Sequence, residues 1–291
     1  MNGVVDDAGI ERRVLPAMKP IFLLGHPVSH SRSPQIHNPS LQKQGVDAMY
    51  LLADVAPENL PDAVAGLRAL GAMGANVTIP HKEAVLPLLD DCSDRARAVG
   101  AVNTLVCTTQ ADGSVHLWGD NTDVPGFLDP LAPQWAALRG QPAVVLGAGG
   151  SARAVVYALL TEVQPSHLTM VARTVSRGNA IRSQLGPYTG DTLMDVQAEL
   201  TADVMASARL IVNCTPVGMH PNEGLSPVPS NAWQSHHIAY DLIYNPTETR
   251  FMKDARAGGA MVIGGMPMLI AQADYAYRHW TGQPLDRSHL L

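Results

Sequence analysis

The sequence predicts an α/β protein of two domains, and three observations support this prediction. Short apolar strands alternate with helical segments along most of the chain, a pattern typical of mostly parallel sheets. A glycine-rich loop lies between a strand and a helix at residues 147–152. Residues 119–142 are rich in proline and glycine and are interpreted as a helical hinge between two groups of strands. With 291 residues, the chain is long enough for two hydrophobic cores.

The strands are predicted from short apolar runs bounded by polar residues, glycine or proline. They are expected at residues 21–25, 48–55, 74–79, 103–109, 143–147, 167–173, 209–215, 237–244 and 260–265. A helix is expected to begin with Asn38 as its N-cap, because Pro39 is tolerated at the first helical position but not in a helix interior.

The boundary between the two domains is placed near Thr122. Residues 1–17 are expected to form a flexible tail, and the two domains are expected to span residues 18–121 and 122–265. Residues 266–291 are expected to contain a C-terminal helix that packs between the domains, because its apolar content exceeds what one buried face requires.

The composition argues against several classes of protein. The net charge is -6 and no Lys/Arg cluster is present, so nucleic acid is not an expected partner. Cys92, Cys107 and Cys214 lack the spacing of a zinc site or a disulfide framework, and they are interpreted as reduced thiols of a cytoplasmic protein. No apolar run is long enough for a membrane span or a signal peptide, and no histidine spacing indicates a metal.

Lys82 follows the sequence "GANVTIPH", in which an alternating strand is ended by Pro80. The residues that follow have helical spacing, which predicts that Lys82 lies in the first turn of a helix, where the macrodipole disfavours a cation. Taken alone, the stretch favours a solvated surface lysine. The other interpretation is a lysine that exchanges a proton with a substrate, because a positive helix terminus favours the neutral amine that a base requires.

The glycine-rich loop "GAGGSA" has the strand and helix context of a dinucleotide site. Gly147 permits a tight turn, Gly149 and Gly150 let the backbone approach a pyrophosphate, and the small Ala152 permits close helix packing. This interpretation is preferred to an accidental glycine-rich turn.

The end of the next strand predicts the cofactor. An acidic residue there would bind the ribose 2′-hydroxyl of NAD, but the sequence is "VARTVSR", with Ala172 at that position. Arg173, Thr174 and Arg177 offer two guanidinium groups and a hydroxyl suited to a 2′-phosphate, which favours NADP. The alternative is that the arginines only cover a helix N-terminus, a poor position for cations unless an anion binds there.

Two further clusters are candidates for binding a small molecule. Ser31 and Ser33 alternate on an extended loop and can bond one carboxylate, although capping of a helix by Ser33 is at least as good an explanation. In "GDNTD", Thr122 is a good N-cap. Asp120 is predicted to converge with Lys82 on a single hydroxyl, since both residues lie at strand ends of one sheet, and to form the catalytic pair with it.

The ordered motifs "SHSRSP", "NVTIPHK", "VGAVNTL", "GDNTD", "GAGGSAR", "VARTVSR", "NCTPVGM", "YDLIYNP" and "MLIAQA" resemble those of the shikimate dehydrogenase family, from about residue 20 to residue 282. The resemblance implies a substrate-binding catalytic domain followed by a Rossmann domain. It also implies reduction of 3-dehydroshikimate to shikimate by NADPH in aromatic biosynthesis, with Lys82 and Asp120 handling the proton. It implies that the substrate is held by Ser31, Ser33, Asn76, Thr78, Asn103, Tyr244 and Gln272, with Gly265 near the nicotinamide.

The sequence departs from the family at Ala172, where asparagine is frequent, at His81, which replaces a frequent aromatic residue, and at Pro39. Two alternatives therefore stay open. One is a quinate or dual quinate/shikimate dehydrogenase that uses NAD, and the other is a ligand-sensing homologue without turnover. The sequence leaves open whether the protein is a monomer or a homodimer.

Overall fold

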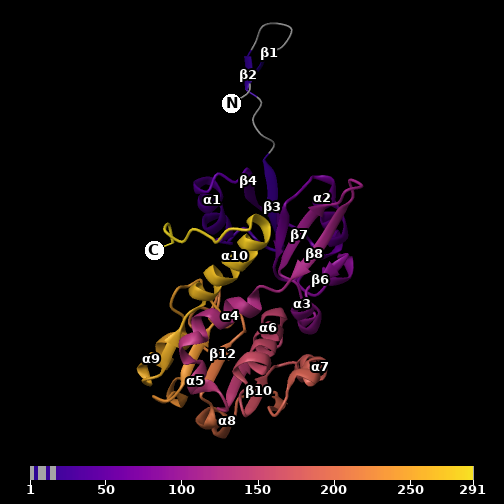
Figure 1. Cartoon of the computed structure of the whole chain (residues 1–291). Helices are drawn as coiled ribbons and strands as arrows, with labels where there is room; N and C mark the ends of the chain where they lie inside the picture. Colours follow the sequence, from indigo (N-terminus) through magenta and orange to yellow (C-terminus); the bar gives the residue numbers. More distant parts are fainter. Residues whose placement is uncertain (1–2, 6–10, 14–17, 291) are drawn as a thin grey trace.

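The computed structural model describes residues 3–5, 11–13 and 18–290, which form two α/β domains built on separate six-stranded sheets (Figure 1). The predicted fold class is confirmed. The predicted flexible tail lies mainly outside the described residues. Within that segment, strand β1 (Gly3–Val5) pairs antiparallel with β2 (Glu11–Arg13).

The N-terminal domain has a mixed sheet with the strand order β4-β3-β5-β7-β8-β6. Its strands are β3 (Lys19–Gly25), β4 (Ala48–Asp54), β5 (Gly74–Val77), β6 (Asp91–Cys92), β7 (Thr104–Thr109) and β8 (Val115–Asp120). Strand β7 runs antiparallel to both β5 and β8, whereas β3 runs parallel to its two neighbours. The carboxyl ends of β3 and β5 therefore lie at one edge of the sheet, where a ligand can be approached from several loops.

The helices of this domain are α1 (Ser33–Lys43), α2 (Leu60–Ala69) and α3 (Asp94–Val99). The prediction that a helix begins at Asn38 is wrong, because α1 begins at Ser33 and contains Pro39 in its interior. Buried Ile36 and Leu41 lie on either side of the proline, and their packing into the core keeps the helix continuous. The Asn38 side chain does not cap this helix; it bonds both backbone groups of Tyr50 in β4.

The second sheet is entirely parallel and has the order β11-β10-β9-β12-β13-β14. The order reverses direction at β9, as in the Rossmann fold. Its strands are β9 (Ala143–Leu146), β10 (His167–Val171), β11 (Leu193–Gln197), β12 (Leu210–Asn213), β13 (Ile238–Asp241) and β14 (Met261–Ile263). Its helices are α4 (Asp123–Leu131), α5 (Trp135–Leu138), α6 (Gly150–Ala158), α7 (Val175–Leu185), α8 (Ala202–Ser207) and α9 (Arg250–Ala257).

Short helical turns connect these elements. They are the 3₁₀ turns η1 (Pro57–Asn59), η2 (Leu86–Leu88), η3 (Ala132–Gln134), η5 (Gly186–Tyr188) and η6 (Ser230–Ala232), and the π-helical turn η4 (Leu159–Val163) that continues α6.

Helix α10 (Gly265–Thr281) crosses the junction between the domains, as Figure 1 shows in yellow. Met268, near its N-terminus, belongs to the core of the Rossmann domain, which also contains Phe127 of α4. Tyr277 and Trp280, near its C-terminus, belong to a core cluster formed with β3, α1 and β4. Both cores therefore bury part of this helix.

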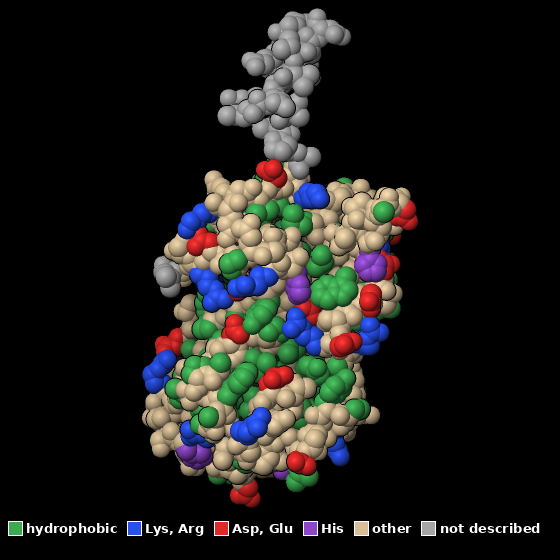
Figure 2. Space-filling model, viewed as in Figure 1, with side chains coloured by type: hydrophobic (Ala, Val, Ile, Leu, Met, Phe, Trp, Pro, Cys, Tyr) green, Lys and Arg blue, Asp and Glu red, His purple; other side chains and the backbone are tan. Residues whose placement is uncertain are grey.

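On the face shown in Figure 2, basic and acidic side chains are intermixed over both domains. None of the helices that the structure describes is both long and apolar enough to cross a lipid bilayer.

Candidate active site

Lys82 lies in a turn that follows β5, at the edge of the sheet that faces the Rossmann domain. The prediction of a helix beginning here is wrong, because the chain forms turns over residues 82–85 and then η2. The Lys82 carbonyl accepts from the Val102 N–H at 2.8 Å, so it is not available for a helical bond. Pro87 could not donate to the Glu83 carbonyl in a helix because proline has no N–H.

The Lys82 ammonium donates to Oδ2 of Asp123 at 2.6 Å. The two side chains are 13% and 8% exposed, so the pair is largely shielded from water but open at one side. Asp123 is the first residue of α4, where the positive end of the helix dipole favours a carboxylate. The structure therefore brings together a lysine of the first domain and a carboxylate at the start of α4, the first helix of the second domain.

Asp120 is not the carboxylate that meets Lys82, and this sequence-based prediction is corrected. Asp120 is fully buried at the end of β8, and it accepts hydrogen bonds from Ser93, Arg95 and His279. Its carboxylate is therefore occupied by α3 and α10. Burial alone would raise the pKa of Asp120, but the bonds from His279, Arg95 and Ser93 hold that pKa below its ordinary value.

Asn103 holds Asp123 in place from the other side. Its Nδ2 donates to Oδ1 of Asp123 at 2.8 Å, while its Oδ1 accepts from the Thr122 N–H at 2.7 Å. Because Asn103 is only 3% exposed and bonds both the side chain and the adjacent backbone, it fixes the start of α4. Each oxygen of the Asp123 carboxylate thus has its own donor.

The other predicted substrate residues of the N-terminal domain come from the start of α1 and from β5 and the residue after it. The Ser31 hydroxyl donates to that of Ser33 at 3.1 Å at the start of α1. Asn76, in β5, donates through Nδ2 to the Asn103 carbonyl at 3.0 Å. Thr78 packs against Gly25 so closely that a methyl group on the glycine would lie 2.3 Å from the threonine Cγ2.

The predicted substrate residues of the second half of the chain come from two elements. Tyr244 lies after β13 and is close enough to Arg32 for the two to interact: burial raises the pKa of Tyr244, and the Arg32 charge lowers it. Gln272 lies in α10, where its Nε2 donates to the Leu269 carbonyl at 2.8 Å. A Cβ on Gly126 of α4 would lie 2.6 Å from that of Gln272, so this glycine lets the two helices approach closely.

The glycine-rich loop lies next to Lys82. Gly147 follows β9 with φ +110°, a conformation that favours glycine, and Gly149 is the N-cap of α6. A Cβ on Gly149 would have no neighbour within 4 Å, which leaves room for a phosphate at the helix N-terminus. A Cβ on Gly150 would lie 3.5 Å from Cδ of Lys82, whereas Ala152 is fully buried under the loop. The loop therefore leaves open backbone at the N-terminus of α6, next to the turn that carries Lys82.

The residues predicted to select the cofactor follow β10. Arg173, Thr174 and Arg177 are exposed, and Thr174 is the N-cap residue of α7. Ala172 is buried, and its N–H donates to the Gln197 carbonyl at 2.9 Å. Its side chain therefore presents no polar group to a ligand at this strand end. Gly265, at the start of α10, is packed against the backbone after β13, and a Cβ there would lie 2.4 Å from the Leu242 oxygen.

The two domains touch beside this loop. Arg153 of α6 forms an ion pair with Glu83 at 3.3 Å, and Gln184 of α7 donates to the Ala98 carbonyl at 2.8 Å. These contacts hold the glycine-rich loop opposite the turn that carries Lys82.

Residues 23–105 match a family model described as the shikimate dehydrogenase substrate binding domain. The shikimate dehydrogenase (NADP(+)) of Salinibacter ruber is 49% identical over 272 residues, covering 92% of this chain and 94% of that protein. This chain belongs to the shikimate dehydrogenase family.

Solved structures agree with this membership. Shikimate 5-dehydrogenase from Thermus thermophilus, in complex with NADP(H) and shikimate, is 37% identical with a TM-score of 0.80, covering 94% of this chain and 97% of that one. Quinate dehydrogenase from Corynebacterium glutamicum, in complex with NAD, is 34% identical with a TM-score of 0.82, covering 94% and 96%.

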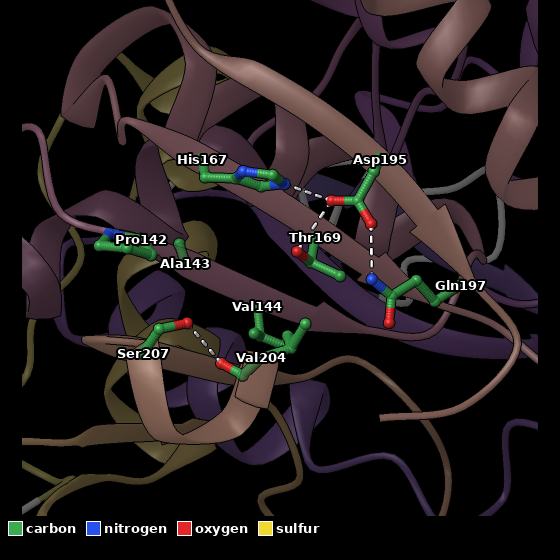
Figure 3. Close-up of a pocket in the computed structure, with 9 residues that line it drawn as sticks. All are labelled: Pro142, Ala143, Val144, His167, Thr169, Asp195, Gln197, Val204 and Ser207. Atoms are coloured by element: carbon green, nitrogen blue, oxygen red, sulfur yellow. Dashed lines mark hydrogen bonds and ion pairs between the residues drawn. The ribbon is translucent and has the colours of Figure 1, made fainter. Parts of the chain in front are cut away.

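This member of the shikimate dehydrogenase family also has a cavity of about 170 Å³ away from Lys82, on the sheet of the Rossmann domain (Figure 3). Its polar side chains are paired with one another: the Asp195 carboxylate accepts from His167, Thr169 and Gln197. Because these side chains are already hydrogen-bonded to one another, we interpret them as the polar covering of an open sheet face and not as a second catalytic site. In the described ranges, no group of three or more His, Cys, Asp or Glu side chains is placed to hold a metal ion.

The carboxylate that bonds Lys82 was missed from the sequence. Asp123 stands directly after the N-cap candidate Thr122, where a helix favours a carboxylate whether or not that carboxylate has another role, so this position does not single it out.

Proposed function

We propose that the protein catalyses the reversible NADP-dependent interconversion of shikimate and 3-dehydroshikimate in aromatic biosynthesis. The observation that supports this best is the pair formed by Lys82 and Asp123 at 2.6 Å, with the glycine-rich loop at Gly150 directly opposite. Oxidation of an alcohol releases a proton as well as a hydride, and this site offers a proton acceptor beside a cofactor loop. Family membership supports the same reaction.

The substrate would lie between Ser31 and Ser33 at one end and the Lys82–Asp123 pair at the other. The serine hydroxyls and Tyr244 would hold the carboxylate, and Thr78, Asn103 and Gln272 would hold the ring hydroxyls. Asn76 contributes mainly through its neighbours, because both of its observed Nδ2 bonds go to protein atoms. This arrangement presents one ring hydroxyl to the pair.

In the oxidative direction, bound NADP⁺ would accept the hydride that the reacting carbon gives up when its C–H bond breaks. The hydroxyl proton passes to the Lys82–Asp123 pair, so that the carbon–oxygen bond becomes a ketone. In the reductive direction, Lys82 returns the proton to the alkoxide oxygen. Asp123 keeps the lysine amine directed at that oxygen.

The cofactor would be held by its phosphates and its nicotinamide. The backbone of Gly147, Gly149 and Gly150 would hold the pyrophosphate, with Ala152 beneath it. Arg173, Thr174 and Arg177 would hold the 2′-phosphate, and Gly265 would lie near the nicotinamide. The small-molecule partners are then shikimate and NADP. The protein would be cytoplasmic, with its three cysteines as reduced thiols. It would be a monomer or a homodimer.

The arginines give a direct test of cofactor choice. Arg173→Gln is expected to raise KM for NADP about tenfold or more, because it removes a charge-assisted contact to the 2′-phosphate. KM for NAD, which has no such phosphate, is expected to stay within about twofold. The measurement is a pair of initial-rate series with the two cofactors. Arg182→Gln, an exposed arginine at the far end of α7, is the matched control. An equal effect of Arg173→Gln on both cofactors would contradict the assignment.

Genetic complementation tests the proposed function in cells. The gene is expected to restore growth without aromatic supplements in a bacterial strain that lacks its own shikimate dehydrogenase. The Lys82→Ala variant, expressed to the same level, is expected not to restore growth. If the folded wild-type protein is present and growth still fails, the proposed function is wrong.

A further inference from the structure

The hydroxyl of Tyr50 lies between two groups of substrate residues. Tyr50 belongs to β4, is 1% exposed, and donates from its hydroxyl to Oδ1 of Asn76 at 2.8 Å. Burial raises the pKa of Tyr50 well above its ordinary value; interaction with the Ser33 side chain lowers it, and proximity to Tyr244 raises it. Asn76, one of the residues predicted to bind the substrate, therefore bonds a buried hydroxyl whose pKa is also influenced by two others, Ser33 and Tyr244.

Asn76 connects this hydroxyl to the reacting end of the site. Its Nδ2 donates to the Asn103 carbonyl at 3.0 Å and to the Thr104 hydroxyl at 3.2 Å, and that hydroxyl donates to Oδ1 of Asn103 at 3.1 Å. Nδ2 of Asn103 then donates to Asp123, the partner of Lys82. A path of hydrogen bonds thus runs from Tyr50 to the proton-handling pair.

The ring of Tyr50 is held so that its hydroxyl has a defined position. It stacks on His37 with ring centroids 4.5 Å apart and an interplanar angle of 11°, and its centroid lies 6.1 Å from that of Trp280. The backbone of Tyr50 is fixed by both polar groups of the Asn38 side chain. A buried side chain held at backbone and ring can fix the groups that bond to its tip.

We infer that Tyr50 is a positioning residue that joins the carboxylate-binding serines to the Asn76–Asn103–Asp123 path. It sets the distance between the end of the site that holds the substrate carboxylate and the end that takes the proton. This inference rests on the proposed function. Tyr50 acts through Ser33 and Asn76 and does not touch the reacting atoms.

The test compares Tyr50→Phe with Tyr277→Phe. Tyr277 is a matched control because it is fully buried in the same core cluster and its hydroxyl also makes one bond, to Gln44 Oε1 at 2.8 Å. Tyr50→Phe is expected to raise KM for shikimate about five- to tenfold, because the lost bond frees Asn76 and Ser33. Its kcat and its KM for NADP are expected to stay within about twofold of wild type. Tyr277→Phe is expected to change none of these constants, with a similar small loss of Tm in both variants.

A double-mutant cycle with Ser33→Ala separates positioning from general loosening of the core. If Tyr50 acts through Ser33, Tyr50→Phe adds little to the KM of the Ser33→Ala variant, so the two effects are not additive. Additive effects, or a KM for Tyr50→Phe equal to that of Tyr277→Phe, would overturn the inference while leaving the proposed function intact. A wild-type protein that does not turn over shikimate would overturn both.

Discussion

Lys82→Ala is expected to lower kcat for shikimate oxidation by about two decades or more, the range for removal of a group that transfers a proton in the transition state. Lys82 is the basic side chain observed to bond Asp123, and it lies directly opposite the glycine-rich loop. The measurement is steady-state turnover with shikimate and NADP, together with the dissociation constant of shikimate. The dissociation constant is expected to change much less than kcat, because the serines and Tyr244, which are proposed to hold the carboxylate, are unchanged in this variant.

Lys253→Ala is the control, since Lys253 is exposed on α9 and lies outside the proposed site. Turnover of Lys82→Ala close to that of the control would show that Lys82 is not the proton-transfer group. A loss confined to shikimate binding would reduce its role to positioning the substrate.

Asp123→Asn is expected to lower kcat by about two decades while the protein stays folded, because the amide keeps the shape but not the charge that directs Lys82. Its Tm is expected to stay close to that of the wild type, since Asn103 can still bond Oδ1. The measurement is turnover beside a thermal melt. Unchanged turnover would remove Asp123 from the catalytic pair.

Asp120→Asn is the contrasting variant in the same five-residue motif. It leaves Arg95 without the carboxylate that it bonds through two nitrogens, and it weakens the bond from His279. Breaking such a buried ionic cluster is expected to cost about 3 kcal/mol of the free energy of unfolding. The measurement is urea unfolding, and the folded fraction should keep a kcat near that of the wild type. A large loss of kcat in fully folded Asp120→Asn would contradict the division of roles.

The lowered pKa of Asp120 also predicts how stability depends on pH. The pKa of Asp120 is lower in the folded protein than the value of about 3.9 expected in the unfolded chain. Its contribution to stability is therefore fully present above about pH 4 and is lost as the pH falls through the folded pKa. The wild type is expected to lose stability more steeply than Asp120→Asn as the pH is lowered below about 4.

Much of the fold could be predicted because its strands are strongly apolar. Among the described strands, β1, β2, β6, β8 and β11 are absent from the predicted ranges, and two of them show why. Strand β6 has only two residues and no pattern to detect. Strand β11 lies at the sheet edge, where its residues are partly exposed and include Asp195 and Gln197, so its pattern does not indicate a buried strand. Helix α1 shows that burial of Ile36 and Leu41 can override the local cost of Pro39.

The sequence predicted that Lys82 meets a carboxylate of the "GDNTD" motif, but not which of the two carboxylates it meets. Asp120 and Asp123 are three residues apart in "GDNTD", and local pattern gives no way to choose between them. The choice depends on which partners reach each side chain: Arg95 and His279 occupy Asp120, and His279 comes from α10, far along the chain. The role inferred for Tyr50 could not be predicted from local pattern either. Its hydroxyl meets Asn76 only once β4 and β5 are placed in one sheet.

The most direct test of the proposed reaction is a spectrophotometric assay of the purified protein that offers shikimate and quinate separately, each with NADP and with NAD. Formation of NADPH with shikimate, at a rate well above the other three combinations, is the predicted result. Faster turnover of quinate, or a clear preference for NAD, would contradict it and place the protein with the quinate dehydrogenases. Absence of turnover in all four combinations would mean that the fold has been kept for binding a ligand without catalysis.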